Sequence, residues 1–363
     1  MNSIEKCLEC GLCSQDCELL KELETSPKQL AERGVGALEA FSCALCGACE
    51  AVCPEGLSPK ALFDKGRRLA VASGEMNLEE FGYLMPDHAY NLMQVYREYY
   101  GIDYSDIEVE NTTGICFFPG CTLMTYAPEL TRAVYSQLQA SCGCGGIISG
   151  CCGKPLTLLG LPDRARNLTD GLIERLHKQD VREVIAACPG CYYELRKLLD
   201  SADIKLKTVY EAMEMPKIGP LNGRRHTVHD SCPDRFEGRF GSQVRELLQH
   251  QGFSLAEMFH NRKNTQCCGS GGLISRFRPD LMEQMVAQRM NEAAATGSEA
   301  MVSYCMSCVA KFADASGGFV SRHALSLLLG RDDDFKGVRS KAAKMMEGPQ
   351  GAELWAKMNS PKK

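Results

Sequence analysis

Cysteine is the residue type whose number and spacing most directly indicate chemistry in this chain of 363 residues. There are 21 cysteines, and this odd number excludes complete internal disulfide pairing. Ten of them form two matching sets, in which a single cysteine precedes an adjacent pair and then a C-x2-C pair. The first set is Cys121, Cys151, Cys152, Cys188 and Cys191, and the second is Cys232, Cys267, Cys268, Cys305 and Cys308. Because thiolate sulfur is the donor that iron–sulfur centres use, each set is predicted to hold one cluster.

The two sets repeat one another along the chain. Matching cysteines are offset by 111 to 117 residues, and the internal gaps are 29 and 35 residues in the first set and 34 and 36 in the second. This repetition predicts two duplicated domains. Glycines follow both adjacent pairs, namely Gly153 in the first set and Gly269, Gly271 and Gly272 in the second. Such glycines would let backbone N–H groups approach cluster sulfurs, or would simply form tight turns.

The first 53 residues contain two further runs with the spacing C-x2-C-x2-C-x3-C, which binds two cubane 4Fe–4S clusters in bacterial ferredoxins. The fourth cysteine of such a run ligates the other cluster. One cluster is therefore predicted on Cys7, Cys10, Cys13 and Cys53, and the other on Cys43, Cys46, Cys49 and Cys17. Pro54 follows the second run as is usual, whereas Glu18 follows the first. Zinc binding through the C-x2-C pairs is the alternative.

Composition and charge narrow the class of protein. Hydrophobic residues make up 44% and charged residues 24%, which is typical of a soluble globular protein. The formal net charge of −5 gives no indication of binding to nucleic acid or to an anionic membrane surface. The beginning of the chain lacks the apolar core of a signal peptide, and no run of about 18 apolar residues exists. We therefore expect a cytoplasmic protein, either free or peripheral on a membrane-bound complex, whose cysteines bind metal or do redox chemistry.

The elements that must position the ten cysteines alternate between strand and helix. Strands are expected in the segments 114–121, 181–191, 225–232 and 299–308, each of which ends at a cysteine of a set. Helices are expected over 127–140, 192–200 and 242–252. Because ligands of parallel α/β units collect beyond the carboxyl ends of the strands, the ten cysteines should gather at sheet edges. Two such domains that face each other would bring their clusters close together.

The predicted fold is of mixed α+β and α/β class, with a helical two-cluster ferredoxin-like domain before two duplicated parallel α/β domains. The expected ranges are 1–80 for the ferredoxin-like domain, 81–113 for a helical linker, 114–222 and 223–330 for the duplicated domains, and 331–363 for a charged tail. The linker is rich in tyrosine and either packs on its own protein or docks a partner subunit. The tail is poorly patterned and is expected to be a frayed helix or disordered, with Trp355 either loosely packed or an anchor.

Each set of five cysteines resembles the CCG, or cysteine-rich, domain of heterodisulfide reductase catalytic subunits. The same domain occurs in iron–sulfur subunits of glycolate, lactate and glycerol-3-phosphate dehydrogenases. The whole layout resembles the D-type subunit of heterodisulfide reductase over roughly residues 1–330. The resemblance implies that each complete set holds a noncubane 4Fe–4S cluster. Cys116 is a rival to Cys121 because it restores a first gap of 34 residues, whereas Cys121 follows Pro-Gly, as the family's first cysteine often follows glycine.

The hypothesis that follows is electron transfer that ends in disulfide reduction, with the ten cysteines of the two sets as catalytic residues. Electrons would enter from a partner, such as a flavoprotein, a hydrogenase or a membrane cytochrome, and pass through two cubane clusters to a pair of noncubane clusters. A small-molecule or thiol disulfide would be held between this pair, and no flavin site is visible on this chain. One alternative is an electron conduit from a flavin dehydrogenase to a quinone or another carrier. Another is zinc in the first CCG domain, with a cluster only in the second.

Polar residues beside the predicted ligands have two possible roles each. Lys154 and Arg235 could bind an anionic substrate or be solvated at the surface. His229 could donate a proton during disulfide cleavage or be a hydrogen-bonded structural histidine. Cys142 and Cys144 lie outside both sets, and they are either a redox-active or metal-binding pair or free thiols in a glycine-rich turn.

Overall fold

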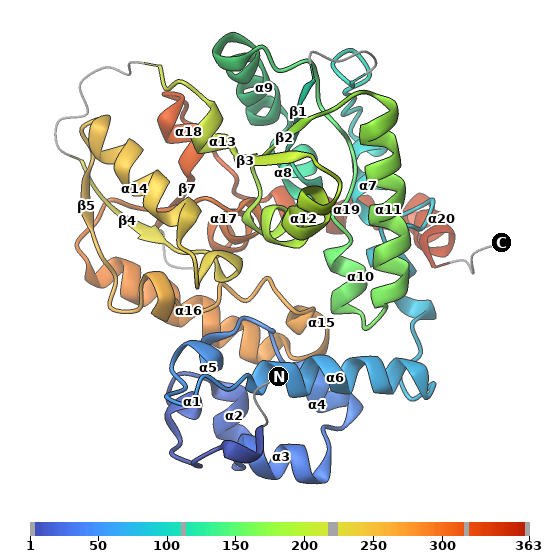
Figure 1. Ribbon diagram of the computed structural model, residues 1–363, viewed down its shortest axis with the longest axis vertical. Helices are drawn as coiled ribbons and strands as arrows, with labels where there is room; N and C mark the ends of the chain where they lie inside the picture. The colour runs from blue at the N-terminus through green and yellow to red at the C-terminus, as the bar shows by residue number, and fades with distance from the viewer. Residues whose placement is uncertain (1–3, 110–113, 217–223, 316–318, 360–363) are drawn as a thin grey trace.

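The computed structural model describes residues 4–109, 114–216, 224–315 and 319–359. A helical N-terminal region packs beneath two regions that each contain a parallel sheet (Figure 1). This arrangement confirms the predicted fold class. The expected boundaries at residues 113 and 222 fall in segments that lie outside the described residues. Among the described residues, no helix combines the length and apolar composition needed to cross a bilayer.

The N-terminal region consists of short helices around the two cysteine runs. They are η1 (Ile4–Lys6), α1 (Leu12–Gln15), α2 (Glu18–Glu22), α3 (Pro27–Arg33), α4 (Ala37–Ser42), α5 (Ala48–Ala51) and the longer α6 (Pro59–Ala72). The two runs fold alike, because Gly11 and Gly47 adopt left-handed backbone angles, φ 75° and 76°, before α1 and α5. Glycine suits this conformation because it has no Cβ. In each run, this glycine comes directly after the second cysteine.

The first sheet has the strand order β1-β2-β3, with all strands parallel. Its strands are β1 (Ile115–Phe118), β2 (Glu183–Ala186) and β3 (Lys205–Thr208). The associated helices are α8 (Cys121–Tyr126), α9 (Pro128–Cys142), α10 (Lys154–Leu158), α11 (Pro162–Lys178), α12 (Pro189–Ser201) and α13 (Val209–Ala212). The cysteines after β1 and β2 therefore lie at the carboxyl edge of this sheet.

The second sheet has the order β5-β4-β6-β7 and is also parallel. Its strands are β4 (Arg225–His229), β5 (Ser254–Ala256), β6 (Ala300–Ser303) and β7 (Val320–His323). Its helices are η3 (Cys232–Asp234), α14 (Arg239–His250), η4 (Arg262–Asn264), α15 (Ile274–Phe277), α16 (Pro279–Ala295), α17 (Met306–Ala313) and α18 (Ala324–Leu328). Cys232 and Cys305 follow β4 and β6, as Cys121 and Cys188 follow β1 and β2.

The sheet registers show that the two sheet regions are duplicates. Ile115 pairs with Glu183 in the first sheet, and His226 pairs with Ala300 in the second. These pairs are offset by 111 and 117 residues, which are the offsets of the cysteines after the same strands. The copies differ at one edge, where a single bridge from Ile147 to Phe117 stands in the position of β5.

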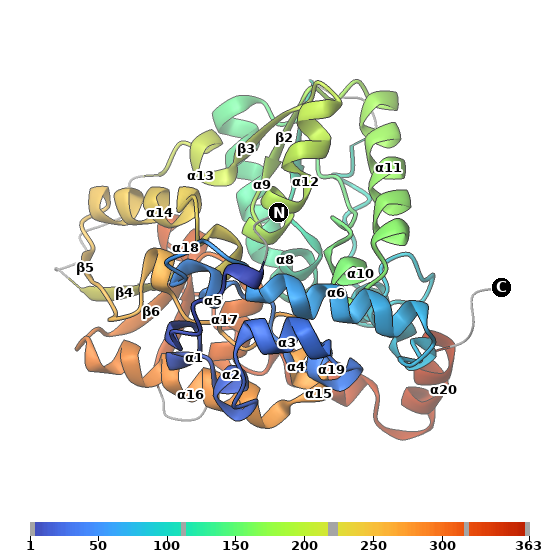
Figure 2. The same ribbon diagram turned by 60° about the horizontal axis from the view of Figure 1, so that its bottom comes forward.

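The two halves share one hydrophobic core. A single buried cluster includes Phe117 and Val134 from the first half together with Phe240 and Val302 from the second. Helix α17 packs on α8, and α12 packs on η3, so the elements that follow the cysteine loops face each other across the interface. Figure 2 shows the N-terminal helices lying across both halves, where α4 contacts α15 and α5 contacts η4.

The expectation of a frayed or disordered tail was wrong. Residues 338–358 form α19 (Val338–Met345) and α20 (Gly348–Met358), and a cluster of buried side chains joins them to the linker. The linker contains η2 (Glu79–Leu84) and α7 (Leu92–Tyr99), and it packs on its own chain. Met358 is fully buried, and the Trp355 ring lies 5.0 Å from that of Tyr83. A few apolar residues suffice to order the tail because they meet tyrosines that the linker presents.

Candidate metal centre

The eight N-terminal cysteines gather into two groups of four. Cys7, Cys10, Cys13 and Cys53 line a cavity of about 280 Å³. Cys17, Cys43, Cys46 and Cys49 line a second, smaller cavity. These are the groupings that the crossed-over assignment of the fourth cysteines anticipates. Their role as ligands remains a prediction.

The first set of five also comes together, as a row of thiols in hydrogen-bond contact. The row runs through Cys121, Cys151, Cys152, Cys191 and Cys188. Gly120 allows this approach, because a Cβ there would lie 3.1 Å from the sulfur of Cys191 and 3.0 Å from the Cβ of Cys188. Cys116 lies fully buried within β1, where burial raises the pKa of its thiol and the neighbouring thiol is Cys144. The structure therefore places Cys121, and not Cys116, in the row.

This placement predicts different results for two serine substitutions. Cys121→Ser should reduce the iron content of the anaerobically prepared protein, because it removes a thiolate from the row. Cys116→Ser should retain the full iron content and cost about 1–3 kcal/mol of stability from a polar group buried in a strand. Iron and labile-sulfide assays on both variants distinguish the two positions. Iron loss confined to Cys116→Ser would show that the assignment is reversed.

The second set forms an equivalent row. It runs through Cys232, Cys267, Cys268, Cys308 and Cys305, and the sulfurs of Cys308 and Cys268 lie 3.0 Å apart. His229 is fully buried at the end of β4, and one of its ring nitrogens lies within 4.8 Å of both of these sulfurs. A hydrogen bond from His229 is one of the causes that lower the pKa of the Cys268 thiol, after those from Cys267 and Cys308. This histidine therefore faces the thiols of the second set, and its role as a proton donor remains a prediction.

Two contacts join these groups into one continuous thiol chain. Cys46 of the N-terminal region contacts Cys267, and Cys305 contacts Cys188 of the first half. The thiol chain runs in the order Cys46, Cys267, Cys268, Cys308, Cys305, Cys188, Cys191, Cys152, Cys151 and Cys121. The sequence predicted that the duplicated sets would lie close together. It did not indicate that the N-terminal region meets the second set at Cys267.

The electrostatics of the thiol chain suit a metal cluster. Hydrogen bonds from adjacent thiols lower the pKa of Cys268, Cys188, Cys152 and Cys121, while the same bonds raise the pKa of the donors Cys267, Cys308, Cys191 and Cys151. Neighbouring thiols thus share protons, because thiolates this crowded cannot all ionise without positive charge nearby. Iron would replace those protons and allow every sulfur to bind as thiolate. The donor set therefore fits iron–sulfur clusters.

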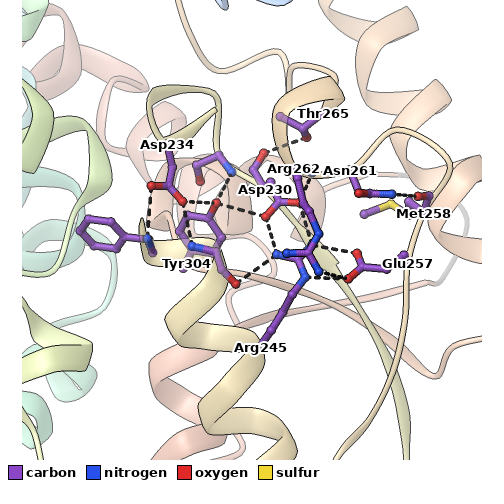
Figure 3. Close-up of polar contacts among 12 residues, drawn as sticks. Asp230, Asp234, Arg245, Glu257, Met258, Asn261, Arg262, Thr265 and Tyr304 are labelled. Atoms are coloured by element: carbon purple, nitrogen blue, oxygen red, sulfur yellow. Dashed lines mark hydrogen bonds and ion pairs between the residues drawn. The ribbon is translucent and has the colours of Figure 1, made fainter. Parts of the chain in front are cut away.

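A buried polar network fixes the strand end that precedes Cys232 (Figure 3). Arg245 donates two hydrogen bonds to Asp230, at 2.7 and 2.8 Å, and two to Glu257, at the same lengths. Asp230 also accepts from the backbone N–H of Arg262 at 2.6 Å, and its carbonyl accepts from the Thr265 hydroxyl at 2.9 Å. The network ties the loop before Cys267 to the loop that carries Cys232. It thereby sets the spacing of two predicted ligands.

Asp234 connects the two halves beside the same turn. Its carboxylate accepts a hydrogen bond from Tyr193 of the first half at 2.5 Å. It accepts another from Tyr304 of the second half at 3.0 Å (Figure 3). It also accepts from the backbone N–H of Gly241 at 2.8 Å. Asp234 is only 2% exposed, and burial raises the pKa of its carboxyl. The turn that begins at Cys232 therefore carries both a predicted ligand and a contact between the halves.

Removing the Tyr193 hydroxyl should weaken the contact between the halves. Tyr193→Phe deletes a hydrogen bond to a buried carboxylate, and we expect the free energy of unfolding to fall by about 1.5–3 kcal/mol. Tyr192→Phe is a matched control, since Tyr192 is the adjacent residue and its hydroxyl makes no hydrogen bond to any of the described residues. For this variant the free energy of unfolding should change by no more than about 0.5 kcal/mol. Urea denaturation of both variants tests the difference, and equal stabilities would contradict this role of Asp234.

Arg67 of α6 binds all three regions and was not anticipated from the sequence. Its side chain is fully buried, and its guanidinium donates to four backbone carbonyls. The acceptors are Ala40 at 2.9 Å, Leu158 at 2.7 Å, Cys43 at 2.6 Å and Gly272 at 2.7 Å. Burial lowers the pKa of Arg67 to about 10, so the side chain remains charged at neutral pH. One side chain therefore fixes the N-terminal region against both duplicated halves.

Gly272, whose carbonyl accepts a hydrogen bond from Arg67, allows the second half to pack closely against the N-terminal region. Its φ is 62°, and a Cβ there would lie 2.5 Å from the carbonyl carbon of Ala44 and 2.6 Å from the carbonyl oxygen of Cys43. The glycine-rich loop after Cys268 therefore brings the second half into backbone contact with the second cysteine run. The role of Gly272 in approaching cluster sulfurs remains a prediction.

The structure also shows the surroundings of the remaining residues that the sequence singled out beside the predicted ligands. Arg235 is 3% exposed and donates to the carbonyls of Cys46 and Lys263, so it is not solvated at the surface. Lys154 is partly buried at the interface, where its ammonium interacts with charges that include those of Cys232 and Cys188. The thiols of Cys142 and Cys144 donate to the backbone carbonyls of Leu138 and Gly146 at 3.2 and 3.5 Å.

Comparison with known families defines the class of protein. Residues 3–57 match the 4Fe-4S dicluster domain, and residues 115–196 and 226–313 match the cysteine-rich domain. The first matched range contains the cysteines that line the two N-terminal cavities. Each of the other two ranges contains strands of one of the two sheets. The chain therefore contains one region that matches the 4Fe-4S dicluster domain, followed by two regions that match the cysteine-rich domain.

Individual relatives place the chain more closely. It is 26% identical over 314 residues to the D-type subunit of the dihydromethanophenazine:CoB–CoM heterodisulfide reductase of Methanosarcina barkeri, covering 80% of this chain and 76% of that relative. It is 24% identical over 330 residues to a subunit of the fumarate reductase (CoM/CoB) of Methanothermobacter marburgensis, covering 83% and 66%. Lactate utilization protein A 1 of Bacillus mycoides is 24% identical over 215 residues, covering 54% and 86%. The resemblance to D-type heterodisulfide reductase subunits is thus confirmed.

Proposed function

We propose that this chain is the disulfide-reducing iron–sulfur subunit of an oxidoreductase complex. The observation that carries the proposal is the continuous thiol chain from Cys46 to Cys121, in which both complete five-cysteine sets meet at Cys305 and Cys188. A disulfide needs two electrons and two protons to become two thiols. Two adjacent centres, joined to an N-terminal electron supply, suit that stoichiometry.

The proposed cofactors are two cubane 4Fe–4S clusters in the dicluster domain and two noncubane 4Fe–4S clusters in the cysteine-rich domains, with no flavin on this chain. The two N-terminal quartets would hold the cubanes, and the two sets of five would hold the noncubane pair. Bound clusters would supply electrons and soft metal sites that attract sulfur. The third reading, with zinc in the first set, is disfavoured because its thiols are as closely connected as those of the second set.

The chain's own residues shape the place where a disulfide would lie. Between the sets, Ser307 and Thr122 approach each other at 3.4 Å between their hydroxyl oxygens. Both are neighbours of predicted ligands, Cys308 and Cys121. Lys154 adds a positive charge near Cys188 and Cys232 on the same interface. We infer that Lys154 attracts the negative charge that develops on sulfur as the substrate bond breaks.

The rival function is that of an electron conduit between a flavin dehydrogenase and another carrier. The similarity to the fumarate reductase relative and to lactate utilization protein A 1 is the observation that favours it. A conduit would use the same thiol chain, but it would not need a substrate between the two sets. The two functions therefore differ in whether thiols are released.

Several relatives are named as subunits, so we propose that this chain also works with a partner protein, in the cytoplasm or against a membrane-bound complex. The point at which electrons enter is the first quartet, where Cys10 is exposed and Leu8 and Leu12 line the same cavity at 64% and 39% exposure. Residues 1–57 contain ten acidic and four basic residues, against a net charge of −5 for the whole chain. The partner should therefore present apolar residues within a basic rim.

Charged substitutions at this surface should weaken the use of the protein donor. Leu8→Glu combined with Leu12→Glu is expected to raise the KM for the donor by at least about tenfold, because charge is placed in an apolar contact. Leu38→Glu, at a position 72% exposed on α4, should leave the KM unchanged. Dithionite-driven reduction should be equal in all variants. Equal KM values for the protein donor would exclude this surface as its docking site.

The proposed function is tested by an anaerobic iron and labile-sulfide assay followed by electron paramagnetic resonance. We expect about sixteen irons per chain, four for each cluster, and a new cluster signal when thiol is added to the oxidised protein. About eight irons together with bound zinc would refute the proposal. About sixteen irons without any response to thiols would favour the conduit.

A further inference from the structure

The junction between the N-terminal region and the second half contains two buried hydrogen-bond donors without partners. Arg235 is 3% exposed, and its Nη2 group has no partner among the described residues. Gln266 is 6% exposed, and its Nε2 group is likewise unpaired within the described part of the chain. Leaving such groups unpaired costs about 1–3 kcal/mol each, so they indicate an acceptor that the protein atoms do not supply.

Both side chains are held beside the second quartet by contacts that fix their position. Arg235 donates through Nε to the carbonyl of Cys46 at 3.2 Å and through Nη1 to the carbonyl of Lys263 at 2.5 Å. Gln266 immediately precedes Cys267 and lines the cavity that is formed by Cys17, Cys43, Cys46 and Cys49. The two donors therefore lie where the thiol chain passes from the N-terminal region into the second half.

The charged residues that line the two N-terminal cavities also make the surroundings of the second cavity less negative than those of the first. Three carboxylates and one lysine line the first cavity, namely Glu9, Glu24, Glu55 and Lys21. Two carboxylates and one lysine line the second, namely Asp16, Glu18 and Lys60, and Arg235 adds a further positive charge beside it. A reduced cluster carries one more negative charge than an oxidised one. These charges therefore make the second position the more favourable place for an added electron.

We propose that Arg235 and Gln266 raise the reduction potential of the centre on Cys17, Cys43, Cys46 and Cys49 by supplying hydrogen bonds and positive charge to its sulfurs. Hydrogen bonds to cluster sulfur and local net charge are established determinants of such potentials. The consequence is a direction for electron flow, from the exposed first quartet towards Cys267. This inference rests on the proposed iron–sulfur centres but not on disulfide reduction. Arg235 and Gln266 are thus positioning residues for electron transfer.

A redox titration of the complete chain, loaded with clusters and followed by electron paramagnetic resonance, tests this inference. The signal of the second centre is first identified as the one that Cys49→Ser removes. Arg235→Met should shift that signal to lower potential by at least a tenfold change in the reduction equilibrium, about 59 mV for one electron, because charge and donors are both lost. Gln266→Leu should shift the same signal in the same direction by a smaller amount. Arg235→Lys, which retains the charge but not the planar donors, should lie between wild type and Arg235→Met.

Arg132→Met is the matched control for charge, since Arg132 is a partly exposed residue of α9 that pairs with Asp106. It should leave every potential unchanged. Unchanged potentials in Arg235→Met and Gln266→Leu, with full iron content, would overturn the inference and leave the proposed function intact. If Arg235→Met loses iron, Gln266→Leu decides, because a downward shift supports the inference and an unchanged potential refutes it. A wild-type protein without the second centre would refute both proposals.

Discussion

Cys268→Ala is expected to lower the iron content from about sixteen to about twelve per chain, because it removes a central thiol of the second set. Cys268 contacts Cys267 and Cys308, and His229 faces the same sulfurs, so alanine breaks the thiol chain in its middle. Disulfide reduction should fall by more than about 100-fold, since losing an outer partner of a metal ligand alone costs up to that much. The signals of the two N-terminal centres should persist, because their quartets do not include this residue.

The control for this experiment is Cys142→Ala. Cys142 is a partly buried cysteine outside both sets, and its thiol makes local hydrogen bonds to the carbonyl of Leu138 and to the backbone of Cys144. This variant should keep the full iron content and the full activity. If Cys268→Ala retained about sixteen irons, the second set would not be a cluster site. Iron assays, resonance spectra and thiol production measured on the same preparations give the comparison.

Arg67→Met is expected to lower the free energy of unfolding by about 3–5 kcal/mol. The substitution leaves four buried carbonyl groups without the charged donor that joins them, and unsatisfied buried groups are among the few causes of losses this large. The carbonyls belong to the N-terminal region and to both halves, at Cys43, Leu158 and Gly272 among others. Electron transfer from the N-terminal centres should slow as well, because the Cys46–Cys267 contact depends on the same interface.

The adjacent residue provides the control. Arg68 is also an arginine of α6, but its side chain is 49% exposed and pairs with Asp64 at the surface. Arg68→Met should change the stability by no more than about 0.5 kcal/mol, as exposed ion pairs contribute little. Chemical denaturation of both variants under the same conditions makes the comparison. Equal stabilities of the two variants would contradict the role assigned to Arg67.

The features that could be predicted from the sequence depend on short spacing and on strand direction. A C-x2-C pair is held together by the chain itself, and parallel strands deliver their ends to one edge of a sheet. The groupings of the eight N-terminal cysteines and of each set of five follow from these two constraints. The duplication was equally visible, because the offsets of the cysteines are the offsets of the paired strands. The roles of these cysteines as ligands remain predictions.

The contacts between regions could not be predicted, because they depend on how separately folded segments dock. Arg67 and Arg68 are adjacent and identical in type, yet one is fully buried and the other is exposed. Gly272 looked like an ordinary turn glycine until Ala44 was found against it. Arg235 was expected either to bind an anionic substrate or to be solvated at the surface, but its Nε donates to the carbonyl of Cys46. Only an alignment of related sequences or the folded chain itself could have separated these residues from their neighbours.

The central claim is that the two cysteine-rich domains together reduce a disulfide with electrons from the N-terminal region. The most direct measurement is a single turnover, in which the fully reduced protein is mixed anaerobically with a set of small disulfides and the free thiols are counted after quenching. We expect two thiols for every two electrons lost from the clusters with at least one disulfide. We expect no thiol release by Cys268→Ala. Clusters that are reoxidised only by a quinone or another electron carrier, without release of any thiol, would contradict the claim.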